Sequence, residues 1–131
     1  MKNSTFQSMA IFLLVFCSFS IASAQEWTAL GVAKVDGRVD HDEIWVTDAK
    51  GNFNAIKLFV KKEGIDFDRV VVHFGNGGHD VMEIKNFIPA GGETRVLDFP
   101  GGDRVIKKVE FFYKSNATTK KKAKVVLYGR S

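Results

Sequence analysis

The sequence predicts an all-β domain, either an antiparallel β-sandwich or a jelly-roll-like barrel, with seven to eight strands. Three observations support this fold class: helical periodicity is scarce after residue 25, apolar and polar residues alternate with a period of two in many segments, and glycine-rich turn signals separate those segments. One-sided alternation of this kind is typical of antiparallel sheets that pack one face inward and expose the other to water.

The N-terminus has the pattern of a secretory signal peptide. Lys2 precedes an apolar stretch at residues 9–16, and the small residues Ala-Ser-Ala follow at 22–24. A membrane-spanning helix needs about 20 apolar residues, so this stretch is too short for one. We therefore expect residues 1–24 to be a signal peptide that is cleaved, and residues 25–131 to form one domain that is secreted or periplasmic, with no transmembrane segment.

The composition of the expected mature domain excludes some functions. Cys17 is the single cysteine of the chain and lies within the predicted signal peptide, so disulfides and cysteine-ligated metals are not expected. The chain carries a formal net charge of +4. Its basic residues alternate with apolar ones and form no dense stripe, so we expect no nucleic-acid partner.

Eight segments of the mature chain qualify as strands, four of them clearly. In chain order the predicted strands are 27–35, 43–47, 55–61, 69–75, 79–84, 94–99, 108–114 and 123–128, of which 55–61, 69–75, 108–114 and 123–128 alternate most regularly. The residues predicted to face the core on those four are Ile56, Leu58, Val60, Val70, Val72, Phe74, Val109, Phe111, Tyr113, Ala123, Val125 and Leu127.

Two Gly-Gly pairs, at 91–92 and 101–102, are ambiguous between turns and an anion-binding loop. A phosphate cradle of the P-loop type leads into a helix and carries a lysine followed by serine or threonine. Each pair here precedes a predicted strand instead. We therefore interpret both pairs as turns in which glycine supplies a positive φ.

Four stretches together resemble an uncharacterised family of small secreted or periplasmic bacterial proteins, a domain of unknown function. They are LGVAKV, FNAIKLFVKKEGIDFDRVVVHFGNG, GGETRVLDFPGGDRVIKKVEFFY and KAKVVLYGR, in that order. The resemblance implies a β-sandwich and a location in the bacterial cell envelope. It implies no catalytic activity.

An acidic segment precedes and opens the second predicted strand. The sequence requires no cofactor, but calcium prefers oxygen ligands, so this segment is a candidate calcium site. Because the segment lacks the spacing of an EF-hand loop, a solvated acidic loop is favoured over a calcium site. The candidate ligands are Asp36, Asp40, Asp42 and Glu43.

The three histidines of the chain are His41, His73 and His79. A hairpin through residues 75–78 would bring His73 and His79 near one another. Zinc hydrolases usually require three ligands on rigid elements, and no pattern here supplies the third. The pattern therefore favours two ordinary surface histidines beside a turn over a zinc site.

Aromatic residues also occur at positions that the alternation places outside. Aromatic rings among basic side chains can stack on sugars or bind a protein partner. The alternative is a covered second face or scattered exposed apolar residues. The candidate binding residues are Phe59, Phe112, Tyr128, Lys57, Lys108 and Arg130.

These patterns together favour a non-enzymatic binding or structural module of the bacterial cell envelope, with an unidentified protein or glycan partner. One alternative is a small metal-dependent hydrolase that uses the acidic loop around His41 or the pair His73 and His79. A second alternative is a homo-oligomeric structural subunit assembled through the aromatic face.

Overall fold

The computed structural model of the chain describes residues 26–35, 40–47, 50–114 and 122–131. These residues form β-strands and turns and no helix. The strands are β1 (Trp27–Val35), β2 (His41–Trp45), β3 (Asn52–Phe53), β4 (Ala55–Lys61), β5 (Ile65–Phe74), β6 (His79–Ile88), β7 (Leu97–Asp98), β8 (Arg104–Tyr113) and β9 (Ala123–Arg130).

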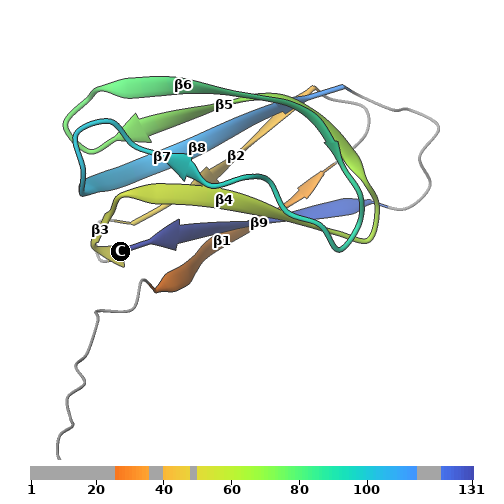
Figure 1. Cartoon of the computed structure of the whole chain (residues 1–131), viewed down its shortest axis with the longest axis horizontal. Helices are drawn as coiled ribbons and strands as arrows, with labels where there is room; N and C mark the ends of the chain where they lie inside the picture. Colours follow the sequence, from red (N-terminus) through yellow and green to blue (C-terminus); the bar gives the residue numbers. More distant parts are fainter. Residues whose placement is uncertain (1–25, 36–39, 48–49, 115–121) are drawn as a thin grey trace, which may run out of the picture.

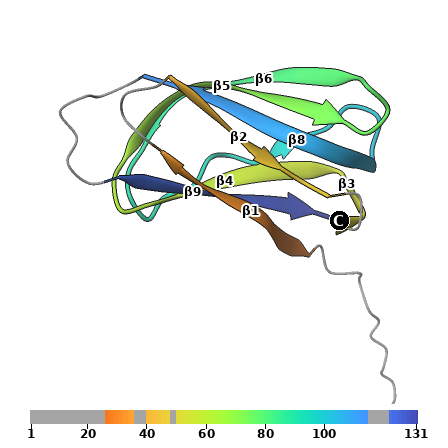
Figure 2. The ribbon, with the colours of Figure 1, turned by 180° about the vertical axis from the view of Figure 1, so that it is seen from behind.

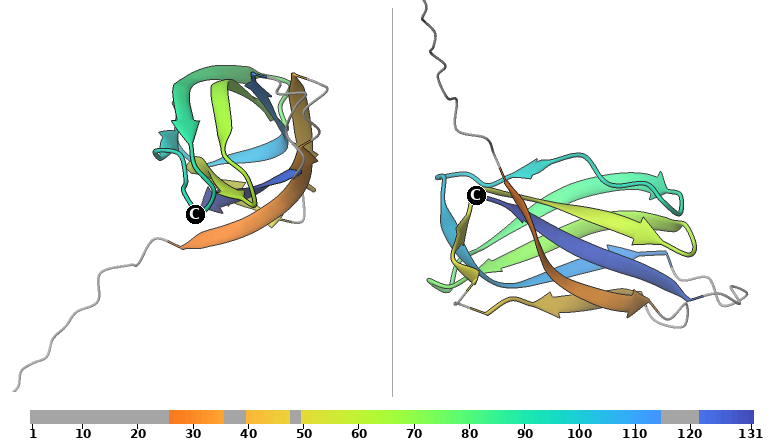
Figure 3. Two further views of the ribbon diagram at one scale, coloured as in Figure 1. Left: turned by 90° about the vertical axis from the view of Figure 1, so that its right-hand side faces the viewer. Right: turned by 90° about the horizontal axis from the view of Figure 1, so that it is seen from below.

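The strands form two antiparallel sheets that face each other across one core. One is four-stranded with the order β1-β9-β4-β7, and the other is five-stranded with the order β2-β8-β5-β6 and β3 paired to β8. Figure 1 shows the sheets as two layers, and the left view of Figure 3 looks along the space that they enclose. This arrangement confirms the predicted all-β antiparallel sandwich.

The core consists of the inward faces of both sheets. All the inward-facing residues predicted on the four clear strands are buried, because strand geometry turns alternate side chains to opposite faces. Aromatic rings fill the centre. Phe111 meets Phe67 edge to face at a centroid distance of 6.0 Å, and Phe74 meets Phe99 at 5.1 Å.

Along one side of the sandwich, the edge strands β1 and β2 of the two sheets contact each other. Figure 2 shows them running side by side on the side that faces the viewer. Gly31 permits the approach, because a Cβ added there would lie 2.5 Å from Cγ2 of Ile44. The contact between β1 and β2 therefore closes the two layers along this side.

Several strand bounds differ from those that the sequence predicted. β5 begins at Ile65 and β8 at Arg104, four residues earlier than expected in each case. β7 spans two residues, and β3 was not predicted. β2 begins at His41, so part of the expected acidic loop is a strand. Strands with charged residues at alternate positions show a weak propensity signal, and pairing with a neighbour decides their ends.

No helix among the residues that the structure describes is long and apolar enough to span a membrane. The predicted signal peptide, residues 1–24, lies outside the described residues, and its cleavage stays a prediction.

Substituting alanine at Gly91, Gly101 or Gly102 should destabilise the fold by about 1–2 kcal/mol, because an L-residue pays that much in the left-handed region. The three glycines have φ values of 88°, 86° and 84°, as expected for the turn interpretation. Urea denaturation of the three variants, with and without phosphate, measures the effect. Unchanged midpoints in all three would contradict a role in turn geometry.

Candidate functional site

The six candidate binding residues are divided between the two outer faces of the sandwich. The structure does not bring Phe112 together with Phe59 and Tyr128, because their strands belong to different sheets. Lys57, Phe59, Tyr128 and Arg130 lie on β4 and β9 of the four-stranded sheet, and Lys108 and Phe112 lie on β8 of the five-stranded sheet.

The outer face of the four-stranded sheet combines aromatic and basic side chains. We call it the basic–aromatic face and define it by Trp27, Lys34, Lys57, Phe59, Lys61, Lys124, Tyr128 and Arg130. Tyr128 lies opposite Lys57, and Trp27 lies opposite Arg130. The Lys57 ammonium is 4.4 Å from the centre of the Trp27 ring, within the range of cation–π attraction. Strand pairing thus gathers four of the six candidates, together with Trp27, which sequence reasoning missed.

Two cations of this face already have acidic partners. Lys57 Nζ lies 2.7 Å from Oε1 of Glu93, and Arg130 Nη2 donates to Oδ1 of Asp98 at 2.6 Å. Arg130 Nε also donates to Oδ1 of Asn54 at 2.7 Å. These contacts fix both side chains in place along one end of the face.

The other end of the basic–aromatic face carries three lysines in register. Lys34 pairs with Lys124 across β1 and β9, and Lys124 pairs with Lys61 across β9 and β4. Neighbouring strands lie about 4.8 Å apart, and like charges directly opposite each other are destabilising. Among the described residues, none of the three lysines has an acidic side chain within ion-pair distance. The row is therefore a concentration of positive charge without a compensating acid in the described chain.

The outer face of the five-stranded sheet carries all three histidines. His73 and His79 lie opposite each other with ring centroids 5.9 Å apart, which confirms the expected proximity. His41 instead lies opposite Phe112 and stacks on it at 5.2 Å. His41 is thus next to Phe112 of β8, and His73 is next to Lys108 of the same strand. These two positions on β8 are four residues apart, or about 13 Å. The three histidines therefore do not converge.

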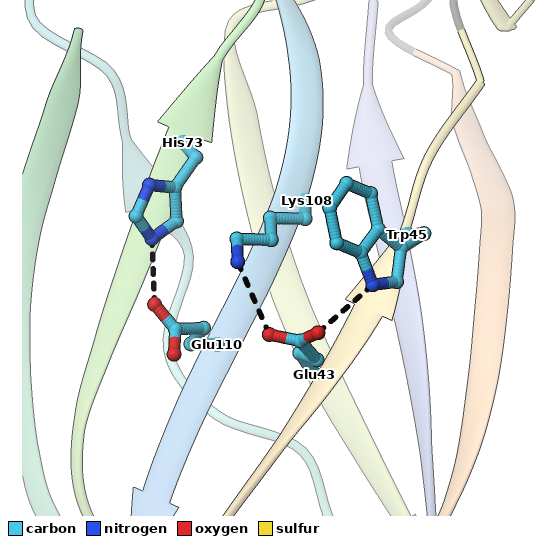
Figure 4. A network of polar contacts seen from close by, with 5 residues as sticks. All are labelled: Glu43, Trp45, His73, Lys108 and Glu110. Carbon is cyan, nitrogen blue, oxygen red and sulfur yellow. Dashed lines mark hydrogen bonds and ion pairs between the residues drawn. The ribbon is translucent and has the colours of Figure 1, made fainter. Parts of the chain in front are cut away.

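Polar contacts, shown in Figure 4, connect β2, β8 and β5 on this face. Glu43 accepts hydrogen bonds from Trp45 Nε1 at 2.9 Å and from Lys108 Nζ at 3.2 Å. The hydrogen bond from Trp45 is the main cause that lowers the pKa of the Glu43 carboxyl, and Lys108 lowers it further. Beside it, His73 Nε2 lies 2.6 Å from Oε1 of Glu110. Since Glu43 and Glu110 are cross-strand neighbours, these separate partners offset the repulsion between the two carboxylates.

The three candidate calcium ligands that the structure describes do not come together. Because residues 41–45 form β2, Asp42 and Glu43 point to opposite sides of the strand: Asp42 accepts a hydrogen bond from Tyr113 at 2.9 Å, whereas Glu43 takes part in the outer network. Asp40 is exposed and contacts the His41 ring at 3.1 Å. Asp36 lies outside the described residues. Over the part of the chain that is described, no three His, Cys, Asp or Glu side chains are grouped so that they could hold a metal ion.

Sequence reasoning also missed Lys34, Lys61 and Lys124 as a group. Strict alternation along 27–35 would place Trp27 and Lys34 on opposite faces, because they are seven residues apart. The bulge between Ala29 and Gly31 brings both to the outer face. Their alignment with residues of β4 and β9 depends on a register that no local pattern encodes.

Comparison with known proteins places the chain by family and by fold. No curated protein matches it. A solved structure of AlgX from Pseudomonas aeruginosa is similar, with a TM-score of 0.54 and 10% sequence identity, over 81% of this chain and 26% of the AlgX chain. The likeness concerns the fold alone, and this chain spans about a quarter of AlgX. The family model described as "Domain of unknown function (DUF2541)" matches residues 8–129, and the chain belongs to that family.

Proposed function

We propose that this domain is a non-enzymatic binding module of the bacterial cell envelope that holds an acidic glycan on its basic–aromatic face. The observation that carries the proposal is the row formed by Lys34, Lys124 and Lys61. An acidic polymer that supplies carboxylates along this row would offset the mutual repulsion of the three ammonium groups.

The rest of the face suits a sugar polymer. Partly exposed aromatic rings at Trp27, Phe59 and Tyr128 offer apolar surfaces on which sugar rings can stack. Lys57 and Arg130 are held in place by their acidic partners, so binding orders few additional side chains and costs less conformational entropy. A sheet face with side chains held in this way favours an extended ligand.

The envelope location rests on the sequence. Residues 1–24 have the pattern of a signal peptide, and an acidic envelope polysaccharide would be accessible to a protein exported in this way. The mildly basic net charge of the chain, +4, favours association with such a polymer.

The double variant Lys61→Gln/Lys124→Gln should bind polygalacturonate about fivefold more weakly than the parent, because two charge contacts at the protein surface are lost. Titration calorimetry with polygalacturonate, at low and high NaCl, measures this difference. Binding of the parent should also weaken steeply with salt, and neutral dextran should bind poorly at both salt concentrations.

Lys107→Gln is the matched control. Lys107 is an exposed lysine of β8, on the five-stranded sheet, and its substitution changes the net charge by the same amount per residue. An equal loss of affinity per charge in Lys107→Gln would show that only net charge matters. That outcome, or binding that NaCl leaves unchanged, would contradict the proposed face.

A further inference from the structure

A cleft lies at the end of the sandwich where the β5–β6 turn and the β7–β8 connection meet, on the left in Figure 1. Its volume is about 810 Å³, within the range of small-molecule sites. The basic–aromatic face has its lysine row at the opposite end, where β1 and β4 finish and β9 begins. The lining residues relevant to binding are Phe74, Asn76, Pro100, Asp103, Arg104 and Val105.

Arg104 is the main hydrogen-bond donor of the cleft. Its side chain is 24% exposed, and its guanidinium carbon lies 3.6 Å from the centre of the buried Phe74 ring. Nη1 approaches Oδ2 of Asp80 to 3.7 Å, which is beyond hydrogen-bond distance. Within the described residues, no acceptor receives a hydrogen bond from this guanidinium. Arg104 thus presents several N–H donors from a position fixed by stacking on Phe74.

The acceptors around Arg104 are also incompletely used. Oδ2 of Asp80 is buried and has no hydrogen-bond partner in the described structure. Asp103 is exposed, and its Oδ1 takes one long hydrogen bond, 3.3 Å from Nδ2 of Asn54. Oδ1 of Asn76 accepts from the Gly78 amide at 2.9 Å, which fixes the orientation of the Asn76 side chain beside the cleft.

The charges select the class of ligand. The charges of Arg104 and Asp103 balance in the lining of the cleft. Asp80 does not line the cleft but lies within ion-pair distance of Arg104, so it adds a second carboxylate nearby and disfavours an anionic ligand. A hydroxyl group both donates and accepts, and adjacent hydroxyls could accept from Arg104 while they donate to Asp103. Pro100 and Val105 offer apolar contact to C–H groups of the same ligand. We propose that this cleft binds one neutral sugar unit.

This inference does not depend on the acidic-glycan proposal, because the two sites share no residue. Titrating the full chain with glucose, galactose, mannose and N-acetylglucosamine, and following Arg104 Nε–H and the amides of residues 75–78 and 101–104 by NMR, tests it. At least one of these sugars should give saturable shifts confined to the cleft, with a dissociation constant of about 1–10 mM.

Three variants identify the groups responsible. Arg104→Lys keeps the charge and loses the planar fork, and it should weaken sugar binding about tenfold. Asp103→Asn replaces an exposed carboxylate, so the fold should be retained, and it should weaken binding about threefold. Arg69→Lys is the matched control, because Arg69 of β5 also stacks on an aromatic ring, that of Phe112 at 3.9 Å, but lies outside the cleft. This variant should leave the sugar affinity unchanged.

Two results would overturn the inference. One is the absence of saturable shifts in the cleft with all four sugars up to about 100 mM, a range that covers the weakest specific sugar sites. The other is tighter binding of glucuronate or acetate than of any neutral sugar, which would make the cleft an anion site. If Lys61→Gln/Lys124→Gln loses polygalacturonate binding and keeps the sugar shifts, the sugar site in the cleft stands. If Arg104→Lys loses the sugar shifts and keeps polygalacturonate binding, the acidic-glycan proposal stands.

Discussion

Replacing Phe111 with alanine should lower the free energy of unfolding by about 3–5 kcal/mol, because it removes a fully buried ring from the centre of the core. Phe111 has no exposed surface. Its ring meets Phe67 edge to face at 6.0 Å and lies 5.9 Å from the Tyr113 ring. Urea denaturation followed by circular dichroism measures the change, and the shift of the midpoint at an unchanged slope gives the magnitude.

Phe112→Ala is the matched control, since it removes the same side chain from the next residue of β8. Phe112 points outward, stacks on His41 at 5.2 Å and lies beneath Arg69 at 3.9 Å. Its loss should cost about 1 kcal/mol or less, the scale of a partly exposed cation–π contact. Equal losses of 3 kcal/mol or more in both variants would mean that the outer face of the five-stranded sheet is covered by another element or molecule.

The inner faces of the strands were predictable because alternation is a local property. In β4, every second residue from Ile56 to Val60 is buried, and the same rule holds for Phe111 and Tyr113 in β8. A strand turns successive side chains to opposite faces whatever its neighbours are. Sequence alone therefore sufficed for the fold class and for most of the core.

The composition of each outer face was not predictable, because it depends on which strands are neighbours. Phe59 and Phe112 are both outward by alternation, yet β4 and β8 lie in different sheets. The row of Lys34, Lys124 and Lys61 forms only because β9 pairs with β1 on one side and β4 on the other. Such pairings join residues far apart in the chain, and short-range patterns carry no information on them.

The acidic segment was interpreted as a loop because its charges disfavour a strand. Pairing of β2 with β8 overrides that local preference, and it places Asp42 beside Phe111 and Glu43 beside Glu110. Because successive side chains of a strand point to opposite faces, the carboxylates of these two adjacent residues are then separated. The candidate metal ligands were thus adjacent in sequence, and the strand geometry moved them apart.

Glycines within strands were harder still to interpret, and Gly129 gives a sharp test. A Cβ at this position would lie 2.7 Å from Cδ1 of Phe53 and 2.8 Å from Cδ1 of Leu30, both buried. Gly129→Ala should therefore cost about 1–3 kcal/mol of unfolding free energy through overpacking, measured by urea denaturation.

In a Phe53→Leu background the smaller side chain should relieve part of the clash, so the cost of Gly129→Ala should fall by about half. An equal cost in both backgrounds would show that contact with Phe53 is not what excludes a side chain here. A stabilised Gly129→Ala variant would show that the core at this point can accommodate a methyl group without strain.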